Sequence, residues 1–195
     1  MPFKGIAAIA VALGAVAATA AYGATRETPS LLRPPGALHE GGFFERCVKC
    51  GRCIEACPYR CIVAAPRDAG FQAGTPVIDP RAHACRMCDG FPCSAACPTG
   101  ALEPVATREE LRMGTARVNK DLCLSYVGNR CEVCYRACPL IDEAITIEFA
   151  AREGDAIHAI FEPVINEDVC TGCGLCVERC VVSEPALAIT VEPAT

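Results

Sequence analysis

A cysteine pattern that occurs four times along the chain constrains this sequence more than any other feature. Its first copy runs from Cys47 to Pro58 and reads C-x2-C-x2-C-x3-C-P. Three thiolates on one short loop can bind three irons of a cubane iron–sulfur cluster, and the fourth, one helical turn later, is directed to a second cluster. The pattern therefore predicts clusters that occur in pairs.

The other three copies vary this spacing. The second reads C-x2-C-x4-C-x3-C-P, the third has a first gap of seven residues, and the fourth is compact but has Val181 in place of the proline. Together the copies supply sixteen candidate iron ligands, which are Cys47, Cys50, Cys53, Cys57, Cys85, Cys88, Cys93, Cys97, Cys123, Cys131, Cys134, Cys138, Cys170, Cys173, Cys176 and Cys180. The seventeenth cysteine, Cys61, is expected to be a buried free thiol.

Zinc and disulfide bonds are the alternatives to clusters. Structural zinc usually takes its ligands from two C-x2-4-C knuckles, whereas each loop here carries more sulfur than one knuckle uses. An export signal would permit disulfides, but a disulfide scaffold gives no reason for one loop to recur four times. We therefore prefer four [4Fe-4S] clusters, with a zinc- or disulfide-stapled scaffold as the alternative.

The N-terminal segment has the composition of a targeting signal. An apolar run from Ile6 to Tyr22 follows Lys4 and fits either a signal peptide or a retained anchor. A cluster protein is expected to be exported already folded, on a twin-arginine signal, yet no arginine precedes Arg26. An arginine-bearing segment upstream of Met1 is our hypothesis; an uncleaved anchor or a protein that is not exported are the alternatives.

These features divide the chain into three parts. Residues 1–24 are predicted to be a signal peptide or anchor, and residues 25–42, rich in proline and glycine, an extended linker. Residues 43–195 form the cluster domain, with cysteine quartets at 47–57, 85–97, 123–138 and 170–180.

Short strands and helices are expected between the cysteine loops. We predict strands at 77–79, 116–119 and 187–191, a hairpin of 144–149 with 156–165, a return to a strand at 99–102, and a short solvent-exposed helix at 107–113 capped by Thr107. The expected fold class is α+β, with two fused bacterial-ferredoxin-like modules that hold two clusters each.

The composition excludes several functions. A net charge of −5 argues against a nucleic-acid partner, which would require a basic face. The sequence contains no dinucleotide-binding or Walker motif and no nucleophile–base pair. The chain is therefore expected to carry electrons and not to be an enzyme by itself.

The spacings leave two ways to pair the quartets. The first and fourth share the compact form, and the second and third are irregular, which suggests a nested arrangement of first with fourth and second with third. Sequential pairing, of first with second and third with fourth, is the alternative.

The chain resembles the MauM/NapG group of ferredoxin-type proteins, and it resembles the NapG-like members more closely than the MauM-like members. The resemblance is carried by the segments LRPPGAL (32–38), CRMCDGFPCSAACPTGAL (85–102), CLSYVGNRCEVCYRACPLIDEAITIE (123–148) and CTGCGLCVERCVV (170–182). It implies four [4Fe-4S] clusters and nested pairing, in which Cys47, Cys50 and Cys53 share a cluster with Cys180; Cys170, Cys173 and Cys176 with Cys57; Cys85, Cys88 and Cys93 with Cys138; and Cys123, Cys131 and Cys134 with Cys97.

The resemblance also implies a function and a location. It indicates a periplasmic electron relay, tethered to the inner membrane if the N-terminal segment is retained, that works with a membrane-bound NapH-like quinol-oxidising protein as part of a quinol dehydrogenase complex. The acceptor would be a periplasmic cytochrome or reductase of a nitrate-reductase-type pathway. The alternatives are the electron-conducting subunit of a molybdenum oxidoreductase complex and a ferredoxin-type protein of methylamine utilisation.

Overall fold

The computed structural model describes residues 30–152 and 154–194. The predicted signal peptide or anchor at 1–24 lies outside these residues. Within the described part of the chain, no helix is long and apolar enough to cross a membrane.

The first half of the described chain forms a module of short elements. The strands β1 and β2 pair antiparallel, with Ile62 opposite Ile78. The elements are α2 (Glu40–Arg46), α3 (Arg52–Glu55), β1 (Ile62–Ala64), the 3-10 helix η1 (Arg67–Gln72), β2 (Pro76–Ile78) and α4 (Pro92–Ala95). We call residues 30–113 the first module.

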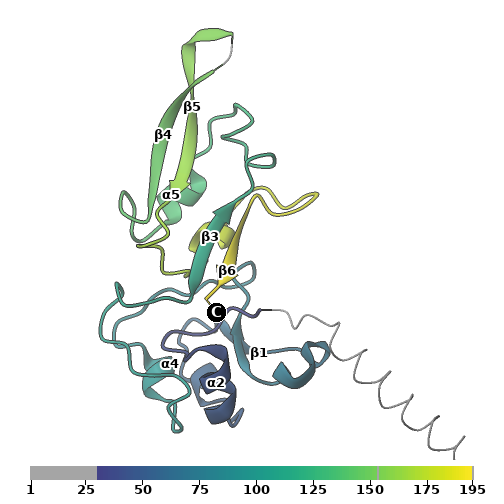
Figure 1. Cartoon of the computed structure of the whole chain (residues 1–195), viewed down its shortest axis with the longest axis vertical. Coiled ribbons are helices and arrows are strands. Elements are labelled where there is room, and N and C mark those ends of the chain that lie inside the picture. Colours follow the sequence, from purple (N-terminus) through teal and green to yellow (C-terminus); the bar gives the residue numbers. More distant parts are fainter. Residues whose placement is uncertain (1–29, 153, 195) are drawn as a thin grey trace, which may run out of the picture.

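The second half, residues 114–194, forms the second module. Strands β3 and β6 pair antiparallel, with Ala116 opposite Val191, and the β4–β5 hairpin projects away from the rest of the molecule (Figure 1). The elements are β3 (Gly114–Val118), α5 (Val133–Ala137), β4 (Ile145–Arg152), β5 (Asp155–Ile165), α6 (Leu175–Arg179) and β6 (Ile189–Pro193). Both modules thus combine small strands with short helices, as the α+β expectation required.

The predicted strands at 77–79, 116–119 and 187–191 and the predicted hairpin all appear, with ends shifted by up to three residues. The return at 99–102 is only a single bridge, between Leu102 and Ala37. In β3 and β6, more buried and more exposed residues alternate, because one face of each of these two strands packs against the interior.

The predicted helix at 107–113 is wrong. The segment contains a turn at 108–110 and then runs into β3, and the side chains of Leu111 and Met113 are buried. The amide of Met113 donates a hydrogen bond to the carbonyl of Thr171, 3.1 Å away. This pairing with a distant segment replaces the local hydrogen bonds that a helix would have made.

The linker predicted at 25–42 is also wrong over its described part. Leu32, Arg33, Pro34 and Pro35 are buried, and helix α2 begins inside the segment. The carbonyl of Gly36 accepts a hydrogen bond of 2.7 Å from the amide of Glu103. This stretch therefore belongs to the first module, because its apolar side chains and backbone groups are satisfied there.

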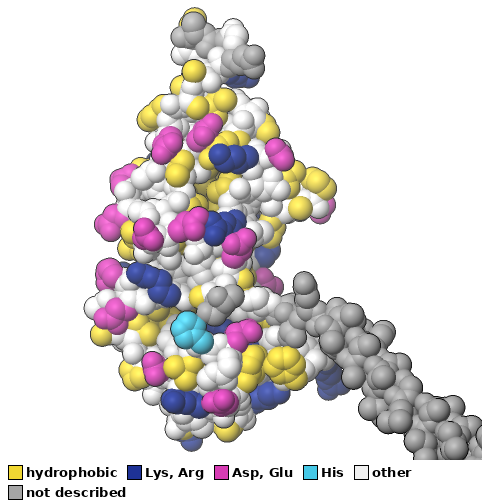
Figure 2. All heavy atoms as spheres, in the orientation of Figure 1, with side chains coloured by type: hydrophobic (Ala, Val, Ile, Leu, Met, Phe, Trp, Pro, Cys, Tyr) yellow, Lys and Arg dark blue, Asp and Glu magenta, His cyan; other side chains and the backbone are white. Residues whose placement is uncertain are grey.

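Cysteines make up much of the core. One buried cluster in the first module combines Phe43, Ile62, Phe91 and Leu102 with cysteines of the first two loops. On the outside, the face drawn in Figure 2 shows charges of both signs interspersed with apolar side chains. The buried cysteines are therefore part of the packing of the interior.

Candidate metal centres

The described part of the chain contains four cavities that are each lined by cysteines from two loops. Of the sixteen candidate ligands, each cavity takes three from one loop and one from the partner loop of the same module. We call them site 1 (Cys47, Cys50, Cys53, Cys97), site 2 (Cys57, Cys85, Cys88, Cys93), site 3 (Cys123, Cys131, Cys134, Cys180) and site 4 (Cys138, Cys170, Cys173, Cys176).

In the first module, two short helices connect site 1 to site 2. Helix α3 contains Cys53, which lines site 1, and Cys57 follows its end and lines site 2. Helix α4 runs between the sites in the reverse sense, with Cys93 in site 2 and Cys97 in site 1. A separation of four residues carries the second thiol about 6 Å along the helix axis, out of the first cavity.

The second module repeats this arrangement. Helix α5 contains Cys134 of site 3, and Cys138 of site 4 follows its last residue. Helix α6 contains Cys176 of site 4, and Cys180 of site 3 follows its last residue. The exchange of the fourth cysteine within a pair of loops, which the C-x3-C spacing predicted, is confirmed as an arrangement of side chains.

The nested pairing is wrong. Cys97 shares its cavity with the first loop and Cys57 with the second, while Cys180 and Cys138 stay within the second module. The partner loops are those whose helices pack together, α3 with α4 and α5 with α6. The similar spacing of the first and fourth quartets reflects similar loop shape and does not decide which loops meet.

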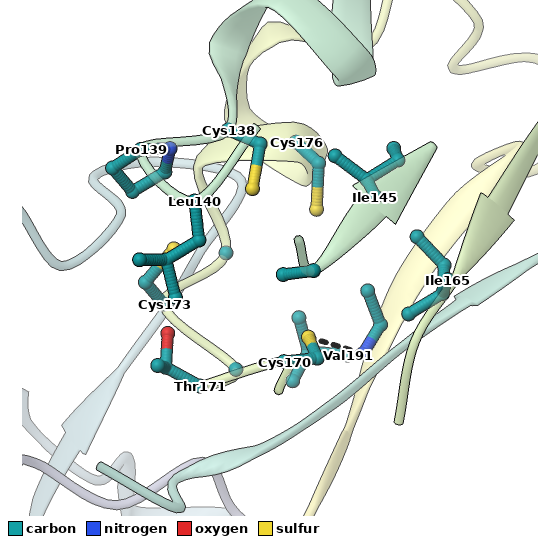
Figure 3. A pocket seen from close by; sticks show the side chains of 14 residues that line it. Cys138, Pro139, Leu140, Ile145, Ile165, Cys170, Thr171, Cys173, Cys176 and Val191 are labelled. Atoms are coloured by element: carbon teal, nitrogen blue, oxygen red, sulfur yellow. Dashed lines mark hydrogen bonds between the residues drawn. The ribbon is translucent and has the colours of Figure 1, made fainter. Parts of the chain in front are cut away.

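Site 4 shows the chemistry of these cavities most clearly. In Figure 3 the sulfurs of Cys138 and Cys176 point into the cavity from the helical side. Its remaining surface is mostly apolar, with Leu140, Ile145 and Val191 among the lining residues. Apolar cavities lined by thiols suit an iron–sulfur cluster, whose potential depends on burial.

The four thiols of each site line the walls of its cavity and do not converge on one point. Among the described residues, no three His, Cys, Asp or Glu side chains converge closely enough to bind one metal ion. A [4Fe-4S] cluster would take one thiolate at each of its four irons. The four-cysteine cavities fit such a cluster.

Backbone amides donate hydrogen bonds to several of these sulfurs. The amide of Leu102 lies 3.4 Å from Sγ of Cys97, and the amide of Ala116 lies 3.4 Å from Sγ of Cys170. The amide of Met87 donates to Sγ of Cys85 at 3.5 Å. Such bonds stabilise charge on the sulfur and are among the features that set a cluster's potential.

Burial raises the pKa of several cysteine thiols. It raises the pKa of Cys53 to about 11 and that of Cys93 to about 12. Burial, with repulsion from Cys123, Cys131 and Cys180, raises the pKa of Cys134 to about 12. A bare thiolate is thus disfavoured in these cavities, and iron cations would supply the missing compensation.

The cysteine loops require left-handed backbone conformations. Gly51 has a φ of +78° and Gly174, in the equivalent position of the fourth loop, a φ of +82°. Lys49, Met87 and Gly172 also have positive φ, each two residues after the first cysteine of its loop. These turns keep three cysteines of one short loop on a single cavity.

Cys61 is a buried free thiol, as predicted. Its sulfur lies 3.4 Å from that of Cys57, and it lines site 2 beside the four cysteines of that site. All seventeen cysteines lie in the described part of the chain, and none forms a disulfide.

Comparison with known proteins identifies the same two units. The 4Fe-4S dicluster domain family matches residues 46–101 and residues 127–183, one match in each module. The first match spans the first and second cysteine loops, and the second match covers the third loop from after Cys123 together with the fourth loop. The two dicluster domains account for four [4Fe-4S] clusters.

The chain is similar to ferredoxin-type proteins along most of its length. It is 44% identical to the ferredoxin-type protein NapG of Escherichia coli over 187 residues, which are 95% of this chain and 79% of the relative. It is 42% identical to the methylamine utilization ferredoxin-type protein MauM of Methylophilus methylotrophus, over 82% of this chain and 70% of the relative. The ferredoxin-type protein NapF of Escherichia coli is 31% identical over 87% of this chain and 90% of its own length.

Proposed function

Since this chain belongs to the family of ferredoxin-type proteins that includes NapG and MauM, and is an iron–sulfur electron-transfer protein, we propose that its sixteen loop cysteines bind one [4Fe-4S] cluster at each of sites 1 to 4. When bound, such a cluster accepts one electron and passes it on. The chain's residues position the clusters, exclude water from them and donate hydrogen bonds to their sulfur ligands.

The observation that supports this assignment best is the agreement between the cavities and the family matches. Both group the loops as first with second and third with fourth. Side-chain placement and sequence similarity thus favour the same grouping of the loops, and side-chain placement adds the four ligand sets.

Iron and acid-labile sulfide analysis of anaerobically purified protein tests the assignment. Four irons and four sulfides are expected for each of the four sites. Substitution of one cysteine in each site in turn should lower the iron content or change the spectrum of that site alone. Protein that contains zinc and little iron would overturn the proposal.

We further propose that the protein relays electrons between a membrane-bound NapH-like quinol-oxidising partner and a periplasmic cytochrome or reductase. The similarity to NapG and NapF supports a nitrate-reductase-type pathway. Membranes that contain the partner should reduce the clusters on addition of quinol, and membranes without it should not. Equal reduction by both membranes would contradict the proposed donor.

Methylamine utilisation is a second candidate pathway, because a MauM protein is almost as similar to this chain as NapG. The acceptor distinguishes the two. A strain that lacks this protein should lose periplasmic nitrate reduction and retain methylamine oxidation if the first pathway is correct, and the reverse if the second is.

The N-terminal part of the proposal concerns residues 1–24, which would serve as a signal peptide or an inner-membrane anchor of a periplasmic protein. The N-terminal sequence of the protein recovered from cells tests this. A mature chain that begins near residue 25 indicates cleavage, and a full-length chain in the membrane fraction indicates an anchor. A full-length chain in the cytoplasmic fraction would contradict both.

A further inference from the structure

The two modules meet where the second and fourth cysteine loops touch. The amide of Cys85, in site 2, donates a hydrogen bond to the carbonyl oxygen of Cys173, in site 4, at 2.9 Å. Cys173 is also part of the buried apolar cluster of the first module, with Cys85 and Met87. One candidate ligand from each module therefore belongs to the same buried contact.

Side chains reinforce this contact from the fourth loop. The hydroxyl of Thr171 donates to Sδ of Met87 at 3.2 Å, and both residues are buried. Thr171 also accepts the backbone hydrogen bond from Met113, the last residue of the first module. The fourth loop is thus held to the first module through both the side chain and the backbone carbonyl of Thr171.

Two glycines allow the close approach. A Cβ on Gly172 would lie 2.4 Å from the backbone nitrogen of Gly114, and a Cβ on Gly174 would lie 2.4 Å from Cβ of Pro80. Real Cβ atoms do not approach so closely, so a side chain at position 174 would push the fourth loop away from the first module, and one at position 172 would push it away from the start of β3, which directly follows that module.

Charged side chains also connect helix α6 to residues 81–86 of the first module. The carboxylate of Glu178, on α6, accepts hydrogen bonds from the amide of Ala84 and the guanidinium of Arg86, both at 2.7 Å. Arg81 donates to carbonyls at the end of α6, including that of Cys180 at 2.9 Å. Because Glu178 and Arg86 are largely shielded from solvent, this pairing orients α6 on the second loop better than an exposed pair would.

We propose that this contact is the place where electrons cross between the modules, so that sites 2 and 4 are neighbours in the route and its order is site 1, site 2, site 4, site 3. The inference rests on the proposed cluster ligands and adds the order, which the sequence does not contain. One electron moves at each crossing, with one site oxidised and the next reduced, and no bond is formed or broken. Thr171, Met87, Gly172 and Gly174 act as positioning residues.

The outer ends of this route have exposed surface. Cys50 of site 1 is exposed, and Val48 in the same loop is 64% exposed. At the other end, Val181 follows Cys180 of site 3 and is 61% exposed. In this order, external partners would reach the relay at sites 1 and 3, and the connection between sites 2 and 4 would stay inside.

The first experiment compares two variants that each lose one site per module. Cys50→Ala with Cys131→Ala removes ligands of sites 1 and 3; Cys88→Ala with Cys170→Ala removes ligands of sites 2 and 4. Iron and sulfide analysis first establishes that each variant retains its two other clusters. In fully reduced protein, electron paramagnetic resonance should show spin–spin interaction in the first variant and its loss in the second.

The opposite pattern, or equal interaction in both variants, would overturn the proposed order. Protein without iron would instead overturn the assignment of clusters on which the inference rests. The two failures are therefore distinguishable.

A second experiment keeps all sixteen loop cysteines and serves if those variants do not fold. Gly174→Ala should move the fourth loop off Pro80, weaken the spin–spin interaction between the modules and slow the exchange of electrons between them, with iron content unchanged. Gly51→Ala is the matched control, because Gly51 has a similar positive φ in the equivalent loop position but nothing within 4 Å of its added Cβ. Equal effects of the two substitutions, or none, would contradict the inference.

Discussion

Cys53 and Cys57 lie only four residues apart on and after helix α3, yet they line different cavities, sites 1 and 2. The helix separates them, and the cysteine that completes site 1 is Cys97, from the second loop. Each loop therefore depends on its partner loop for a complete set of four thiols. This interdependence leads to the first prediction.

Cys57→Ser should disturb the cluster of Cys85, Cys88 and Cys93 and leave that of Cys47, Cys50 and Cys53 intact. Alkylation of newly accessible thiols, located by peptide mass spectrometry, measures which site has opened. Cys61→Ser is the control, since Cys61 lines the same cavity without completing a set of four, and it should retain full iron content. Opening of the first loop, or of the loop at Cys170, would contradict the sequential arrangement.

Thr99→Val should lower the reduction potential of site 1. The hydroxyl of Thr99 lies 3.8 Å from Sγ of Cys97, and it must be the donor when that sulfur is an iron ligand. Loss of a donor destabilises the more negative reduced state, by about 1 kcal/mol at most, or on the order of 40 mV for one electron. Thr99 is exposed, which reduces the shift further.

Potentiometric titration followed by electron paramagnetic resonance measures this potential. Thr190→Val on β6, an exposed threonine away from the site 1 cavity, is the control. An upward shift in Thr99→Val, or an equal shift in both variants, would show that this hydroxyl does not act on the sulfur.

Gly36→Ala should destabilise the protein by about 1 to 3 kcal/mol, because Gly36 has a φ of +77° and an added Cβ would lie 2.0 Å from the carbonyl oxygen of Glu103. The midpoint of guanidinium-induced bleaching of the clusters measures the effect. Gly51→Ala shares the positive φ, in the left-handed helical region (φ +78°, ψ −4°), but has nothing within 4 Å, so it should cost only about 1 kcal/mol. Similar midpoints for both variants would mean that residues 30–38 do not stabilise the module.

Arg33→Met should cost about 3 kcal/mol. The buried guanidinium of Arg33 donates to the hydroxyl of Thr75 at 2.8 Å and to the carbonyl of Pro76 at 3.2 Å, and it also bonds the side chain of Gln72. It lies 4.7 Å from the ring centre of Phe43. Burial lowers the pKa of Arg33, because desolvation disfavours the charged guanidinium. The hydrogen-bond partners offset this cost.

The same bleaching midpoint, recorded beside that of Arg67→Ala, checks this prediction. Arg67 is exposed, and its loss should change stability by less than about 0.5 kcal/mol. An Arg33→Met protein as stable as the parent would show that the methionine stem replaces the whole contribution of the guanidinium.

The sequence by itself determined the features that depend on neighbouring residues. The C-x2-C-x2-C spacing places three thiols on one loop, and the x3 that follows carries the fourth to another cavity, because a short helix lies between them. The alternation of Ile145, Ile147 and Phe149 predicted the first strand of the hairpin, because a period of two is also a property of neighbouring residues.

The tertiary structure alone decided which loops meet. The grouping of Cys97 with the first loop depends on the packing of α3 against α4. The contact of Cys85 with Cys173 depends on the close approach of other backbone and side-chain atoms to Gly172 and Gly174. Such contacts join residues more than forty positions apart, and their free energy comes from burial and backbone hydrogen bonds that no local pattern encodes. The burial of Leu32 and Arg33 and the extended path of 107–113 follow from the same kind of contact.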